Sequence, residues 1–196
     1  MLWIAGAERG TPSATNSSSP PTASPTPAAS LPAYRPDAPP ALVLGPTFAA
    51  EDATKIQTFP DWPFAFRTPP AMTCNAGSGG SGASTYSCRQ GDQPKHVTLA
   101  LVLRKATSGC NAAELGQLEK LAPLAPGSTF VSSGPVTRYA DTSLAASGRT
   151  QFTLVHCFGG GSGRPPTSAI IYQGNAPTDQ RELILKIAND IRSQTG

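Results

Sequence analysis

The chain has few charged side chains, few aromatic side chains and no apolar run long enough to cross a membrane. Charged residues make up 14% of its 196 residues and aromatic residues 7%, with a formal net charge of +3. Nucleic-acid binding needs a basic surface interleaved with aromatic side chains, and a membrane helix needs about twenty apolar residues. We therefore predict no nucleic-acid partner, and contact with a membrane only through an upstream anchor.

The four cysteines lack the close pairs that are typical of zinc sites. Such sites usually take two ligands from one tight turn, only a few residues apart. The spacing is much wider for Cys74, Cys88, Cys110 and Cys157. An even number of cysteines favours two disulfides, with a zinc site of cysteines, alone or with histidine, as the alternative. The disulfide interpretation predicts an oxidising compartment, and we expect no metal and no cofactor.

The expected pairing is Cys74–Cys88 and Cys110–Cys157. The first pair is close in sequence and encloses the glycine-rich stretch 75–82, which cannot pack. A bridge that closes about 15 residues contributes about 3 kcal/mol through loop entropy. The second pair would tie the start of a predicted helix to a strong strand.

The N-terminal quarter has the composition of a tether. Residues 1–8 begin with seven apolar or small residues, and we interpret them as the remnant of a signal or membrane segment. Residues 9–46 are rich in Pro, Ser, Thr and Ala, which predicts a disordered, semi-extended spacer. Asn16 within it fits a glycosylation sequon formally. The folded domain is predicted to span residues 47–196.

Alternating apolar residues predict the sheet. Val97, Leu99, Leu101 and Leu103 recur at every second position, so residues 95–104 are predicted to form a central strand with its other face nearly covered. Residues 151–158 form a second expected strand. After a glycine-rich turn, residues 168–172 are expected to pair back on it as a hairpin.

Three segments are expected to be helical. Residues 49–57 suggest a short helix. Asn111 is a good N-cap for a helix that ends near Pro123, and Glu114 occupies the acidic position of a capping box. The C-terminal segment carries the clearest apolar stripe, with Thr178 or Asp179 as the expected cap. The fold class predicted is α+β, with an antiparallel sheet of five to seven strands and a short and a C-terminal helix packed on it.

The stretch 64–74 resembles the opening of a type of actinobacterial envelope domain. Phe64–Arg67 reads as a strand, Pro69 and Pro70 follow, and Cys74 precedes a second cysteine. Domains of this kind follow a membrane helix and a Pro/Ser/Thr tether and resemble the PsbP-like α+β fold. The resemblance covers about residues 47–196 and implies an antiparallel sheet closed by a C-terminal helix. Met72 stands where tryptophan is expected, and no active-site residue is implied.

No motif predicts catalysis. The run 159–164 lacks the Lys and helix start of a phosphate-binding loop. His96 and His156 lie in predicted strands, where half-exposed polar residues are common. A metal site of both histidines with Asp92 or Asp141 is an alternative. Cys157 cannot act as a nucleophile activated by the adjacent His156, because neighbouring residues of a strand point to opposite faces of the sheet.

The function predicted is a non-catalytic extracytoplasmic module. It would be tethered to the envelope, on the outer face of the cytoplasmic membrane or in the cell wall. There it would bind a ligand, a wall component or a protein partner, as a sensor region would. A secreted hydrolase built around His96 or His156 is the alternative, and a structural surface protein is the third. A histidine, a carboxylate and a hydroxyl that converge in one pocket would favour the hydrolase.

Overall fold

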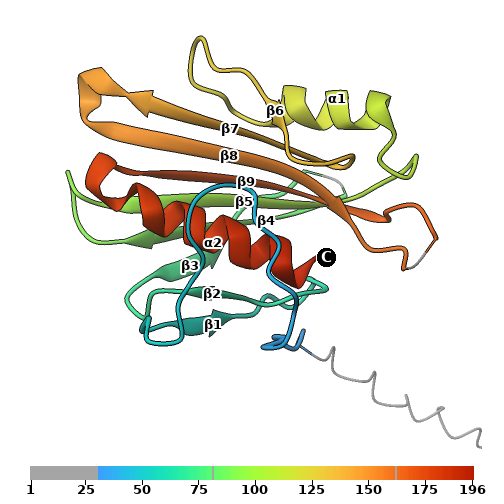
Figure 1. Ribbon diagram of the computed structural model, residues 1–196, viewed down its shortest axis with the longest axis horizontal. Helices are drawn as coiled ribbons and strands as arrows, with labels where there is room; N and C mark the ends of the chain where they lie inside the picture. Colours follow the sequence, from blue (N-terminus) through green and yellow to red (C-terminus); the bar gives the residue numbers. More distant parts are fainter. Residues whose placement is uncertain (1–30, 81, 162) are drawn as a thin grey trace, which may run out of the picture.

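The fold is α+β, as predicted. The computed structural model describes residues 31–80, 82–161 and 163–196, and within these ranges two antiparallel sheets and two α-helices form (Figure 1). A small sheet pairs β1 (Lys55–Gln57) with β2 (Phe66–Thr68). The large sheet has seven strands in the order β3 (Thr73–Ala76), β4 (Ala83–Gln90), β5 (Val97–Lys105), β9 (Ser168–Pro177), β8 (Arg149–Phe158), β7 (Thr137–Leu144) and β6 (Val131–Ser132).

The three strongest strand predictions are confirmed. The predicted strand 95–104 corresponds to β5, and the 151–158 and 168–172 segments form the antiparallel β8–β9 hairpin. One detail was wrong, because the middle strand of the sheet is β9 and not β5. Ala100 on the second face of β5 is exposed, so that face is not nearly covered.

The two helices cover opposite faces of the large sheet. Along β8, Leu154 belongs to the core beneath α2 (Arg181–Gln194), while Val155 belongs to the core beneath α1 (Ala112–Leu121). Successive strand residues point to opposite faces, so a strand buried on both sides loses the simple polar alternation. This explains why β8 is buried almost throughout.

Gly174 lets α2 lie close to β9. A Cβ atom at this position would come 2.7 Å from the Cβ of Ile184, which is too short for two carbon atoms that are not bonded to each other. The neighbouring Tyr172 is fully buried, and its hydroxyl donates to the carbonyl oxygen of Ile184 at 2.8 Å. The helix is thereby fixed against the sheet by both packing and a buried hydrogen bond.

The predicted helix over residues 49–57 is wrong. Ala49 and Asp52 form a turn, in which the backbone N–H of Ala49 donates to the Asp52 carboxylate at 2.9 Å. Residues 55–57 then form β1, which pairs with β2. Pairing with a strand distant in sequence has overridden a weak local helix propensity.

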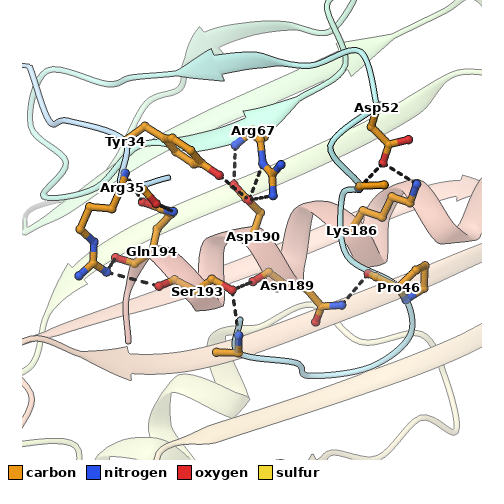
Figure 2. Close-up of polar contacts among 12 residues, drawn as sticks. Tyr34, Arg35, Pro46, Asp52, Arg67, Lys186, Asn189, Asp190, Ser193 and Gln194 are labelled. Carbon is orange, nitrogen blue, oxygen red and sulfur yellow. Dashed lines mark hydrogen bonds and ion pairs between the residues drawn. The ribbon is translucent and has the colours of Figure 1, made fainter. Parts of the chain in front are cut away.

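Residues 34–46 lie along α2, whereas the sequence places them in a disordered tether that ends at residue 46. The Asn189 side chain is fully buried and spans this segment: its Oδ1 accepts from the N–H of Val43 at 2.8 Å, and its Nδ2 donates to the carbonyl of Pro46 at 2.8 Å (Figure 2). Ser193 Oγ accepts from the N–H of Ala41 at 2.9 Å. These contacts correct the expected boundary at residue 47; residues 1–30 lie outside the described part.

Both predicted disulfides are present. Cys74 and Cys88 face each other directly across the β3–β4 pair, and Cys110 is joined to Cys157. The second bridge fixes the loop before α1 to β8 within the α1-side core. All four cysteines are therefore explained by bridges, which are compatible with an oxidising environment.

The predicted helix caps are only partly right. Asn111 caps α1, because its Oδ1 accepts from the N–H of Glu114 at 2.9 Å. The Glu114 carboxylate binds the preceding loop, where it accepts from the N–H groups of Thr107, Ser108 and Cys110. Neither Thr178 nor Asp179 caps α2 as expected. Residues 178–180 form a 3₁₀ turn, and α2 begins at Arg181 without a side-chain cap.

Candidate functional site

A cavity of about 690 Å³ lies where the β8–β9 hairpin meets the C-terminal end of α2. This volume is within the range of small-molecule binding sites. We call it the His156 cavity; its lining includes Arg35, Phe64, His156, Phe158, Arg192 and Thr195. Four segments of the chain, distant in sequence, contribute these residues. The cavity is therefore a product of tertiary packing and not of a local motif.

His156 is the buried polar group of the cavity. It lies on β8, directly opposite Thr137 of β7, and the two side chains are hydrogen-bonded, with 2.9 Å between Nδ1 and Oγ1. The residue is 1% exposed, so the expectation of a half-exposed histidine is wrong. Its Nε2 is buried as well and makes no hydrogen bond of normal geometry among the described residues, although the backbone carbonyls of Val136 and Thr195 lie close to the ring. Buried nitrogen atoms are rarely left without a partner.

The imidazole of His156 is neutral. Burial, assisted by the positive charge of Arg192, lowers the pKa of His156 to about 3. The carbonyl groups of Val136 and Thr195 act in the opposite direction but do not offset burial. The neutral ring carries one N–H. The Thr137 hydroxyl can donate or accept at Nδ1, so Nε2 can carry either an N–H or a lone pair.

Two arginines bring positive charge to this end of α2. The Nη2 atom of Arg35 donates to the carbonyl oxygens of Ser193, Gln194 and Gly196 at the end of the helix. Arg192 is half-buried, and burial lowers the pKa of its guanidinium below the usual value. Within the described part of the chain, no carboxylate lies at ion-pair distance from Arg192.

One wall of the cavity is aromatic. The rings of Phe64 and Phe158 meet edge to face, with 5.4 Å between their centroids. Both residues are buried, and the His156 ring stacks at 6.0 Å from Phe158. None of the described lining residues carries a carboxylate side chain. The cavity thus combines an apolar wall, a neutral imidazole and a cationic rim.

The second histidine lies elsewhere. His96 precedes β5, and its Nε2 lies 3.3 Å from the side-chain nitrogen of Gln93. Partial burial, with the charges of Arg149 and then Arg89, lowers the pKa of His96. It does not line the His156 cavity.

The alternative metal site does not form among the described residues, where no cluster of three or more His, Cys, Asp or Glu side chains was found. Asp141, one of its expected ligands, is paired with Arg181 of α2. The glycine-rich run that begins at Gly159 is the hairpin connection expected from the sequence, and Ser162 within it lies outside the described residues.

Comparison with known proteins identifies no relative. No protein-family model matches the chain, and neither a curated protein nor a solved structure matches it. Across the residues that the structure describes, no helix is long and apolar enough to span a bilayer. Interpretation of the cavity therefore depends on its own chemistry.

Sequence reasoning missed the cationic part of the site. Arg192 lies outside the apolar stripe of the C-terminal helix and looks like a solvated residue, whereas Arg35 falls in the segment assigned to the tether. The available signal was Arg192 in the last turn of a helix, with no acid three or four residues away along the chain. Such an arginine is common, because cations are favoured near helix C-termini.

Proposed function

We propose that this chain is a non-catalytic extracytoplasmic module that binds a ligand in the His156 cavity. The observation that carries the proposal is a cavity of about 690 Å³ whose lining combines two phenylalanine rings with two arginines that have no Asp or Glu partner among the described residues. A ligand that filled the cavity would cover the apolar wall and place a counter-charge beside the arginines.

The two disulfides support a location outside the cytoplasm, because such bridges persist in oxidising compartments. The proline-rich segment N-terminal to residue 34 would act as the spacer between the domain and an envelope anchor. The resemblance to the PsbP-like α+β domains of the actinobacterial envelope stays part of the proposal.

The hydrolase alternative receives less support from the geometry. A catalytic imidazole is normally oriented by a carboxylate at one ring nitrogen. At His156 that position is taken by the hydroxyl of Thr137, and the described lining of the cavity has no acidic side chain. We therefore favour binding over hydrolysis.

The test is a thermal-shift screen on the oxidised 196-residue chain. Soluble wall fragments, short-chain lipids and small aromatic and aliphatic compounds serve as probes. A ligand at about one hundred times its Kd stabilises the folded state by about 2.7 kcal/mol, which is readily detected as a rise in Tm.

Two tryptophan variants localise any binding. Thr167→Trp places a bulky side chain at an exposed position that lines the cavity, and Thr73→Trp makes the same change on the edge strand β3, outside the lining. We expect at least one probe to raise the Tm of the wild type and of Thr73→Trp but not of Thr167→Trp. If no probe does so, or if the shift persists in Thr167→Trp, the proposal is wrong.

A further inference from the structure

The His156 cavity is lined by two arginines, Arg35 and Arg192, and neither has an Asp or Glu partner among the described residues. Arg192 is half-buried in the last turn of α2 and has no acidic partner there, whereas the other ion pairs of α2 are complete: Asp190 with Arg67, Arg181 with Asp141, and Lys186 with Asp52. A partly desolvated charge gains more from a counter-ion than a fully hydrated one does. Arg192 is therefore the position at which an anionic group would bind most favourably.

The carbonyl groups at the end of α2 do not oppose this arrangement. They carry the negative end of the helix dipole and would repel an anion if they were free. The carbonyls of Ser193, Gln194 and Gly196 are occupied by the Arg35 guanidinium, which also brings a compensating charge. The Arg192 guanidinium is left to interact with a ligand.

Beyond the arginine, the cavity is suited to an apolar group. Phe64 and Phe158 are 3% and 7% exposed and meet edge to face, and Val136 and Pro166 are also part of the lining. The neutral His156 ring stacks on Phe158 behind this wall and adds no charge to it. A ligand that matches Arg192 and this wall has one anionic end and a short apolar body.

We propose that the His156 cavity binds a monocarboxylate with an apolar body, whose carboxylate pairs with Arg192 and whose body packs against Phe64 and Phe158. The planar fork of the Arg192 guanidinium fits one carboxylate in a bidentate manner. This inference rests on the proposed function, because it names the ligand class of the same cavity.

The experiment compares three isosteric probes by calorimetric titration of the oxidised full chain at physiological ionic strength. The probes are 4-phenylbutyrate, its neutral amide 4-phenylbutyramide and the cation 4-phenylbutylamine. We expect the carboxylate to bind about tenfold to a hundredfold more tightly than the amide, as a charge-assisted hydrogen-bonded pair requires. The amine should bind most weakly.

Matched variants assign that preference to one residue. Arg192→Gln removes the charge while it keeps a good helix former, and it should abolish the preference for the carboxylate over the amide. Arg192→Lys should restore part of it. Arg164→Gln removes an equal charge from an exposed arginine of the β8–β9 connection that does not line the cavity, and should leave the preference unchanged.

The possible outcomes separate the two proposals. If the carboxylate and the amide bind equally well and Thr167→Trp blocks both, the cavity is a ligand site but the carboxylate inference is wrong. The inference is also wrong if Arg164→Gln and Arg192→Gln weaken binding equally, since the effect would then be general electrostatics. Failure of all three probes to bind overturns the inference, while the wider screen decides the proposed function independently.

Discussion

The Asp190 carboxylate on α2 accepts from the backbone N–H of Arg67 at 2.7 Å and from its guanidinium Nε at 2.8 Å. The Tyr34 hydroxyl adds a third donor at 3.2 Å, so one buried acid joins the N-terminal segment and β2 to the last helix (Figure 2). Asp190 is 2% exposed as a side chain, and its charge is hydrogen-bonded rather than hydrated.

Replacement of this acid tests how strongly the small sheet depends on it. We expect Asp190→Ala to lower the free energy of unfolding by about 3 kcal/mol, because the loss of one partner leaves Arg67 partly buried without its counter-charge. Urea denaturation with the disulfides intact measures the change. Asp37→Ala, at an exposed acid, is the control and should cost less than about 0.5 kcal/mol. Similar losses in both variants would contradict this view.

Asn189 is predicted to hold residues 43–46 on α2. Asn189→Ala leaves the N–H of Val43 and the carbonyl of Pro46 without their partner, at a cost of about 2 kcal/mol. Amide hydrogen exchange should accelerate at residues 43–46 before the β8–β9 hairpin is affected. Asn75→Ala, on an exposed edge position, provides the matched control. Unchanged exchange at residues 43–46 would show that the segment is held by other contacts.

The stability of the fold should fall as the pH falls below 6.5. The pKa of His156 is about 3 in the folded state and 6.5 in an unfolded chain. Between these two pH values the imidazole is therefore protonated in the unfolded state and neutral in the folded state. The contribution of neutral His156 to the free energy of unfolding is complete above pH 6.5. Near pH 5 the free energy of unfolding falls by about 1.4 kcal/mol for each pH unit.

Urea denaturation at several pH values between 7 and 4.5 measures this slope. His156→Gln should flatten the profile by the contribution of one proton. His96→Gln should leave most of the slope in place, because that ring is only partly buried. Identical slopes in the wild type and His156→Gln would mean that the imidazole is protonated in the folded protein.

The two disulfides should differ in their contribution. The bridge Cys110–Cys157 joins residues that are 47 positions apart in the sequence, and Cys74–Cys88 joins residues that are 14 positions apart. The loop-entropy model gives about 4 and 3 kcal/mol respectively. The double variant Cys110→Ala/Cys157→Ala should therefore have the lower Tm of the two double alanine variants. The reverse order would show that local strand pairing by the first bridge matters more than loop length.

The parts of the fold that could be predicted from the sequence are those with a strong local pattern. Alternation at Val97, Leu99 and Leu101 gives β5, and Cys74 with Cys88 are close enough in sequence to be paired. The three residues of β1 have no such pattern, since they form a strand only because β2 lies beside them. A short local segment does not contain that information.

The site could not be predicted for a related reason. The pKa of His156 depends on burial beneath α2 and on Arg192, and the partner at its Nδ1 is Thr137 on another strand. The segment that carries Arg35 looks disordered by composition, because the acceptors that fix it lie on a helix more than a hundred residues later. Composition reports on local tendencies and not on such pairings.

The most direct test of the account is nuclear magnetic resonance of the histidine side chains during titration with 4-phenylbutyrate. The chain has two histidines, so their ring signals are easily distinguished. We predict a saturable change in the Nε2 signal of His156, no change at His96, and loss of the effect in Thr167→Trp. Saturable binding that leaves the His156 ring signals unchanged would contradict the assignment of this cavity as the ligand site.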